Sequence, residues 1–113
     1  MKKYHLSLMV VVTCLSANVS FAYDGWSAGE IDEIRYQKSR TLITQFGATN
    51  PGQCSDHRYI MLREDGSDFA KRANAVLLAA QISGKTAKII LSGCSHGENT
   101  GYPVLSEVLI TND

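Results

Sequence analysis

The chain has 113 residues and is formally neutral at pH 7, with eleven basic and eleven acidic residues. It has no polybasic run, so we expect neither a nucleic acid nor an anionic membrane surface as its main partner. A chain of this length holds one small domain.

The first 22 residues have the features of a secretory signal peptide. Lys2 and Lys3 precede the apolar run Leu6 to Leu15, which is too short to span a bilayer comfortably. Small residues follow at Ser20 and Ala22, which predicts cleavage after Ala22. We therefore expect a signal peptide over 1–22, a single domain over 23–113, a secreted or periplasmic location and no stable membrane insertion. A lipid anchor at Cys14 is the alternative, but Thr13 before it is unfavourable.

Two cysteines, Cys54 and Cys94, remain after cleavage. Because exported proteins meet an oxidising compartment, these two are expected to form a disulfide. A loop of this length would stabilise the fold by about 4 kcal/mol in the chain-entropy model.

The segments before the central helix alternate in the manner of strands. Residues 26–36 form a long curved strand in which the spacing of Ile31, Ile34 and Tyr36 requires a bulge near Asp32 or a bend at Gly29. Residues 40–46 complete a hairpin with it. A loop rich in turn formers covers 47–56, and residues 58–62 form a short third strand.

Residues 67–94 are predicted to form a capped helix and then a strand. Ser67 is a favourable N-cap and Gly84 a favourable C-cap. Between them the apolar residues recur at helical spacing, which leaves Lys71, Arg72, Asn74 and Gln81 on the face away from the barrel. Beyond Gly84, the residues Ala87, Ile89 and Leu91 alternate with polar neighbours.

A polar loop over 92–101 leads to a last strand over 104–111. There we expect Val104, Val108 and Ile110 on one face, and Leu105 and Leu109 on the other. The element order β-β-β-α-β-β is that of the OB-fold, an all-β barrel with one helix between strands three and four. An α+β sandwich of the same order is the alternative architecture.

The run FAKRANAVLLAAQISGKTAKIIL resembles the B subunits of bacterial AB5 toxins, nearest to the subtilase-cytotoxin and pertussis-like B subunits. Ser83 to Ile89 matches their turn and following strand. The resemblance implies a homopentamer that binds a cell-surface glycan and carries a separate enzymatic A subunit. In cholera-type B subunits a Cys-x-Trp-Asn-Asn-Lys segment contributes to sugar binding. Here only Cys94 agrees and His96 replaces the tryptophan, so the galactose-binding role does not carry over.

Sugar recognition requires aromatic faces surrounded by polar groups. Tyr36 and Tyr59 are aromatic candidates, and the predicted ligand-binding residues are Trp26, His96, Glu98, Asn99, Thr100 and Tyr102. For Trp26, a packing role in the core or rim is the alternative.

Two chemical alternatives involve the cysteines. Cys54, His57, Cys94 and His96 could together bind zinc, and Cys94 with His96 and Glu98 could form a nucleophilic site. A disulfide would exclude both. No established catalytic or nucleotide-binding motif occurs, so neither enzymatic activity nor a cofactor is expected. The first functional hypothesis is therefore an exported glycan-binding module, and the second is a monomeric periplasmic OB-fold protein with a structural, stress-related or protein-binding role.

Overall fold

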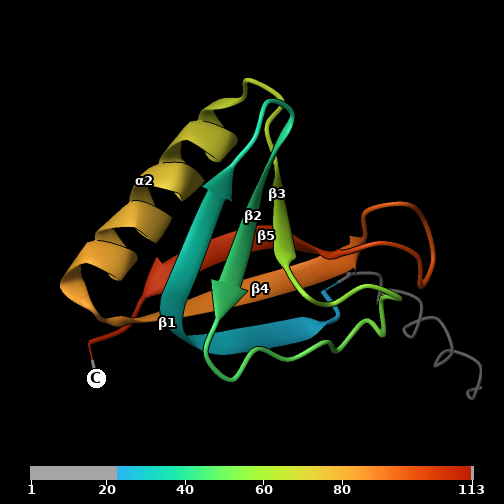
Figure 1. Cartoon of the computed structure of the whole chain (residues 1–113), viewed down its shortest axis with the longest axis horizontal. Helices are drawn as coiled ribbons and strands as arrows, with labels where there is room; N and C mark the ends of the chain where they lie inside the picture. Colours follow the sequence, from blue (N-terminus) through green and yellow to red (C-terminus); the bar gives the residue numbers. More distant parts are fainter. Residues whose placement is uncertain (1–22, 113) are drawn as a thin grey trace, which may run out of the picture.

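The computed structural model describes residues 23–112. The predicted signal peptide and the alternative anchor at Cys14 lie outside the described residues. The elements are β1 (Gly25–Tyr36), β2 (Arg40–Gln45), β3 (Ile60–Arg63), α2 (Asp68–Ser83), β4 (Thr86–Cys94) and β5 (Pro103–Ile110). This confirms a small, mostly β domain with one helix after the third strand (Figure 1).

The five strands form a closed barrel in the order β1-β2-β3-β5-β4. Four of the five contacts between neighbouring strands are antiparallel, and β3 meets β5 in parallel through the single pair Met61 and Val104. The first half of β1 pairs with β4 and its second half with β2, so this strand belongs to both sides of the barrel (Figure 1).

The curvature of β1 has two sources. The register shifts between Ile31 and Glu33, which confirms the predicted bulge near Asp32. Before the bulge, Gly29 passes close to the main chain of β2, and a Cβ added there would collide with the carbonyl oxygen of Phe46. Phe46 itself was expected in the second strand, but it lies just beyond β2 with its side chain 62% exposed.

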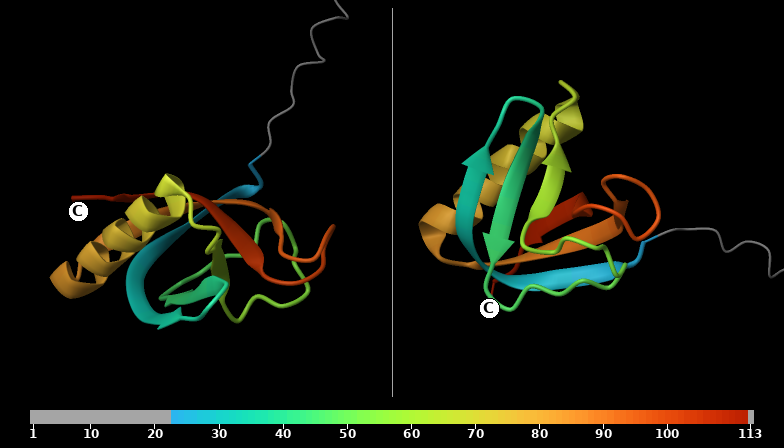
Figure 2. Two further views of the ribbon diagram at one scale, coloured as in Figure 1. Left: turned by 90° about the horizontal axis from the view of Figure 1, so that it is seen from above. Right: turned by 45° about the vertical axis from the view of Figure 1, so that its right-hand side comes forward.

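The helix packs across one open end of the barrel (Figure 2). Its buried residues are Ala70, Ala73, Leu77 and Ala80, and the last three belong to the core that the strands form. The predicted caps are confirmed, because Ser67 Oγ accepts from the Ala70 N–H at 3.1 Å and Gly84 adopts a left-handed conformation with φ of 69°. Within the part of the chain that the structure describes, no helix is long and apolar enough to cross a membrane.

The alternation in β4 is confirmed, since Ala87, Ile89 and Leu91 are all buried. The expected faces of β5 are wrong for Val104 and Leu105, and correct for Val108, Leu109 and Ile110. Leu105 is buried and packs in the core together with Val108 and Ile110, whereas Val104 is only half-buried. The register explains this result, because Ile90 pairs with Glu107 while the next residue, Leu91, pairs with Leu105. Ser106 is therefore an extra residue in β5, and the side chains before and after it exchange faces of the sheet.

The expected outer face of the helix is also wrong in part. Lys71 and Arg72 are exposed, but Asn74 and Gln81 turn toward the barrel. The Asn74 amide donates to Glu64 Oε2 at 2.6 Å, and the Gln81 amide donates to the Asp32 carbonyl at 3.2 Å. Polar side chains thus serve the helix–barrel contact, where apolar periodicity alone assigns them to solvent.

Candidate functional site

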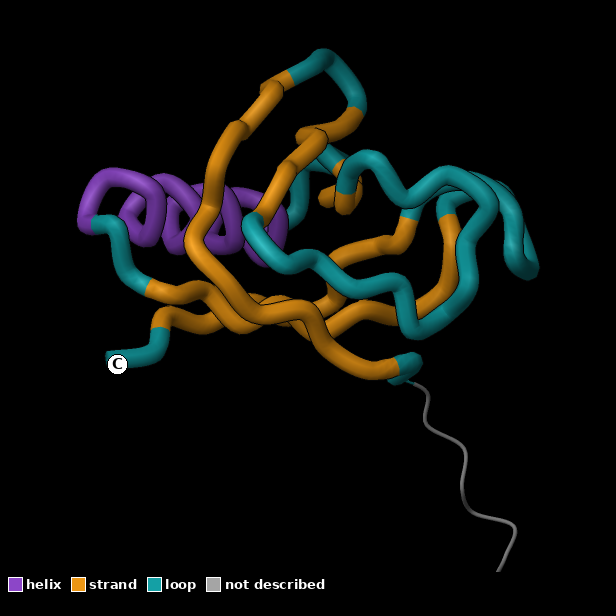
Figure 3. The backbone as a smooth tube through the Cα atoms, turned by 60° about the horizontal axis from the view of Figure 1, so that its bottom comes forward, coloured by secondary structure: helices purple, strands orange, loops and turns teal. Residues whose placement is uncertain are grey.

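Two loops that are far apart in the sequence lie side by side at one end of the molecule (Figure 3). They are residues 46–59, before β3, and residues 95–102, between β4 and β5. The predicted disulfide between Cys54 and Cys94 is confirmed and joins them. The Asn99 amide adds hydrogen bonds to the carbonyls of Gly52 and Gln53, both at 3.2 Å. These contacts make the two loops a single connected surface.

The disulfide excludes both chemical alternatives for the cysteines, the zinc site and the nucleophilic site. Both sulfurs are bonded to one another, so neither is available as a thiolate. Zinc binding by Cys54 and Cys94 and nucleophilic attack by Cys94 both require that thiolate. Both alternatives are therefore excluded while the disulfide is intact.

The structure places the six predicted ligand-binding residues in three separate locations. Trp26 lies on β1, opposite Ile90 of β4, and its side chain is 58% exposed. The Lys88 ammonium nitrogen lies 4.6 Å from the centre of its ring and occupies one ring face. Trp26 is therefore a surface residue of the β1–β4 sheet, and the structure does not bring it together with the loop residues.

Glu98, Asn99 and Thr100 form the tip of the second loop. Asn99 has a positive φ of 57°, and its amide is already engaged with the first loop. Thr100 Oγ1 donates to the Glu98 carbonyl at 3.0 Å. Two of the three side chains thus maintain the loop conformation. Glu98 instead lines a shallow pocket of about 400 Å³ with Asp24, Gly52, Gly93, Cys94, Gly97 and Asn99.

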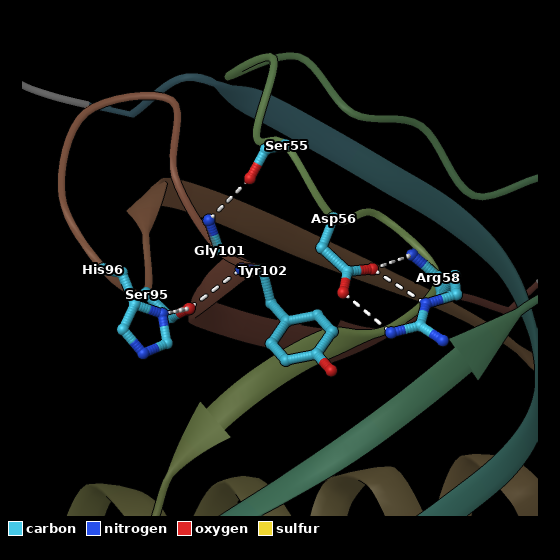
Figure 4. Close-up of polar contacts among 7 residues, drawn as sticks. All are labelled: Ser55, Asp56, Arg58, Ser95, His96, Gly101 and Tyr102. Carbon is cyan, nitrogen blue, oxygen red and sulfur yellow. Dashed lines mark hydrogen bonds and ion pairs between the residues drawn. The ribbon is translucent and has the colours of Figure 1, made fainter.

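His96 and Tyr102 lie at the base of the same loop, on the side of β3 (Figure 4). Ser95 Oγ connects them, because it accepts from the Tyr102 N–H at 2.8 Å and lies 3.0 Å from His96 Nδ1. Among the described residues, no carboxylate contacts His96, so the Ser95–His96 pair lacks the third group that orients a catalytic base.

Tyr102 belongs to a cluster of aromatic and cationic side chains, which we call the Arg–Tyr cluster: Arg35, Arg40, Arg58, Tyr59 and Tyr102. The rings of Tyr59 and Tyr102 meet edge to face, with centres 6.1 Å apart. The Arg35 guanidinium lies 5.6 Å from the Tyr59 ring centre, and that of Arg40 lies 5.5 Å from the Tyr102 ring centre. Each ring therefore has a cation over its face.

Arg58 enters the cluster as half of an ion pair with Asp56 (Figure 4). Its guanidinium donates to both carboxylate oxygens of Asp56, at 3.0 and 2.8 Å. These hydrogen bonds are the main reason that the pKa of Asp56 is lowered to about 2 and that the pKa of Arg58 is raised. The Asp56 N–H also donates to the Gly101 carbonyl, which attaches the pair to the second loop.

The Arg–Tyr cluster lies on the outer face of β2 and β3. Leu42 and Met61 are paired neighbours on this face, and they are only 3% and 4% exposed although they lie outside the main hydrophobic cluster beneath the helix. The face thus carries a small apolar patch beneath a cover of arginine and tyrosine side chains. A surface of this composition can donate many hydrogen bonds to a polar ligand and still offer it aromatic and aliphatic contact.

The arginines of this face were missed in the sequence. Arg35 lies on β1, Arg40 on β2 and Arg58 in the loop before β3, and nothing in their spacing indicates that they converge. The available signals were Tyr59 and Tyr102, which were both aromatic candidates near loop ends.

The chain was also compared with protein-family models, curated protein sequences and solved structures, and none of them matches it.

Proposed function

We propose that this protein is an exported, non-catalytic OB-fold module that binds a glycan through the Arg–Tyr cluster and the adjoining loop 95–102. The OB-fold assignment is supported by the closed strand order β1-β2-β3-β5-β4 and by the position of α2 between β3 and β4. OB-folds bind oligosaccharides and oligonucleotides on the face of strands two and three, between the loops that follow strands one and four.

The observation that carries the proposal is the position of the Arg–Tyr cluster on that face. Two tyrosines supply ring surface and hydroxyl groups, and three guanidinium groups supply fixed donors. A sugar needs both kinds of contact, because its C–H faces pack on rings while its hydroxyls must be hydrogen-bonded. The formal neutrality of the chain and the absence of a polybasic run favour a glycan over a nucleic acid.

A glycan array probed with the purified exported protein tests this function. We expect binding that Tyr102→Ala abolishes, because that change removes the central ring of the cluster. Trp26→Ala is the matched control, since it deletes an exposed aromatic residue on another strand pair and should leave binding unchanged. Absence of any binding, or loss of binding in the Trp26 variant alone, would exclude this face as the site.

The resemblance to toxin B subunits adds the proposal of a homopentamer with a separate enzymatic subunit. Three large apolar side chains on α2 are exposed and would suit an interface between copies: Phe69 at 41%, Leu78 at 51% and Ile82 at 76%. Light scattering coupled to size-exclusion chromatography decides between this assembly and the monomeric alternative. A monomer at micromolar concentration removes the pentamer and leaves the glycan proposal to the array.

A further inference from the structure

A second feature of the outer face is a pair of arginines placed directly opposite each other. Arg40 at the start of β2 is the cross-strand partner of Arg63 at the end of β3. Directly opposed residues of an antiparallel pair project from the same side of the sheet. Like charges in this position repel each other and destabilise the sheet, so the pairing needs a compensating interaction.

The described part of the protein does not supply a compensating negative charge. Arg40 Nε donates to Gln37 Oε1 at 2.8 Å, and Arg63 donates to the Ser95 carbonyl at 3.2 Å. Both acceptors are neutral. Within the described residues 23–112 there are two ion pairs, and their arginines are Arg35 and Arg58. No carboxylate among the described residues therefore neutralises either guanidinium group, and most of their N–H donors have no acceptor in these two contacts.

The nearest acidic residue in the sequence, Glu64, is committed elsewhere. Its Oε2 atom accepts from Thr41 Oγ1 and from the Asn74 amide, both at 2.6 Å. Thr41 and Asn74 lie on the side of the sheet that faces the helix, away from Arg40 and Arg63. The Glu64 carboxylate therefore stabilises the helix contact and does not neutralise the arginine pair.

The two arginines line a pocket of about 260 Å³ between the β1–β2 turn and the loop 95–102. The rest of its wall is Ser39, Met61, Ser95 and His96. Ser39 adds a hydroxyl and His96 an imidazole. His96 Nδ1 lies 3.0 Å from Ser95 Oγ, and this contact leaves Nε2 as the ring nitrogen that the serine does not use.

From this arrangement we infer that the pocket is a binding site for a tetrahedral oxyanion, a phosphate or sulfate ester group. One bidentate arginine satisfies the two oxygens of a carboxylate, whereas a tetrahedral group offers three oxygens and can accept from two guanidinium groups at once. The inference goes beyond the proposed function, because it assigns a charged group to a defined pocket and holds whether or not a sugar carries that group.

The test is an NMR titration of the exported protein with inorganic phosphate and with inorganic sulfate, at constant ionic strength set by sodium chloride. We expect saturable shifts confined to the signals of the six residues that line the pocket, which are Ser39, Arg40, Met61, Arg63, Ser95 and His96. Acetate should bind at least about tenfold more weakly, since its single charge and two oxygens offer two guanidinium groups fewer acceptors than a tetrahedral anion does. Unsaturable shifts, shifts spread over the whole surface, or equal affinity for acetate would each overturn the inference.

Arg40→Gln and Arg63→Gln should each weaken binding about tenfold or more, because each removes a charged donor. Arg72→Gln is the matched control, since Arg72 is an exposed arginine on α2 that belongs neither to the pocket nor to the Arg–Tyr cluster. Arg40→Lys retains the charge without the planar fork and should give intermediate affinity. An equal loss in the Arg72 variant would reduce the effect to general electrostatics and overturn the site.

The same titration with three sugars then identifies the source of the oxyanion group. The sugars are glucose 6-phosphate, glucose 6-sulfate and glucose. Binding of either ester above the level of glucose supports the pocket and identifies the preferred ester. Equal binding of glucose itself would contradict the assignment. Because the first titration uses inorganic anions alone, a failure of the oxyanion site remains distinguishable from a failure of glycan binding.

Discussion

Among individual residues, Asp56 and Arg58 form an ion pair whose contribution to stability depends on pH. The pKa of Asp56 is lowered to about 2 by hydrogen bonds from Arg58, against an ordinary value of about 3.9. A carboxylate whose pKa is lowered in the folded state stabilises that state fully above its ordinary pKa. This contribution is lost as the pH falls toward 2.

We therefore expect Asp56→Asn to lower the melting temperature by a small, constant amount above about pH 5. The difference between the two proteins should shrink between about pH 5 and pH 2 and vanish only below about pH 2. Other carboxylates with lowered pKa, such as Asp65 at the helix start, are present in both proteins and cancel. Thermal unfolding followed by circular dichroism measures the difference, and a constant difference across this window would contradict the prediction.

At the same scale, the sequence predicted some contacts of the candidate site and missed others. Counting the cysteines that follow the predicted signal peptide was enough to predict the bond between Cys54 and Cys94. The convergence of Arg40 with Arg63 depends on the register of two strands, and no short sequence pattern encodes that register. Trp26 illustrates the converse, because a residue type suited to sugar binding lies on another part of the surface.

Among the elements, β1 has the most demanding geometry, since it takes part in both sides of the barrel. The close approach of Gly29 to the carbonyl of Phe46 leaves no room for a side chain. We expect Gly29→Ala to lower the free energy of unfolding by about 1–3 kcal/mol through this clash. Urea denaturation measures the change.

Glu30→Ala provides the control for the Gly29 substitution. Its side chain is exposed next to the crossing, so the free energy of unfolding should stay within about 0.5 kcal/mol of the wild type. If Gly29→Ala proved equally neutral, the end of β2 would have to move aside without cost.

The elements also show which sequence signals are sufficient. The caps of α2 and the alternation of β4 are local features, and both were predicted correctly. The faces of β5 were not, because the extra residue Ser106 is recognisable only from the pairing of β5 with β4. Asn74 and Gln81 were misplaced because their polar partners come from distant segments.

For the whole molecule, the disulfide is the main covalent constraint on a small core. We expect the double variant Cys54→Ala, Cys94→Ala to lose about 4 kcal/mol of stability, the value for a closed loop of this length. Urea denaturation of the variant, and of the reduced wild type, measures this loss. A loss below about 1 kcal/mol in both would mean that hydrogen bonds alone hold the two loops together.

The weakest junction of the barrel is the parallel contact of β3 with β5, which rests on the single pair Met61 and Val104. Closed barrels protect their strand edges from other chains, and this seam is where such an edge would first be uncovered. The proposed oxyanion pocket lies beside this seam, since Met61 of the seam pair lines it together with Ser95 and His96 of the loop between β4 and β5. A ligand held there would connect β3 to the loop before β5. Bound phosphate or sulfate should therefore slow amide hydrogen exchange in β3 and β5 more than in β1. In this small barrel, a ligand in a surface pocket would thereby suppress the separation of β3 from β5, which would uncover strand edges that can pair with other chains.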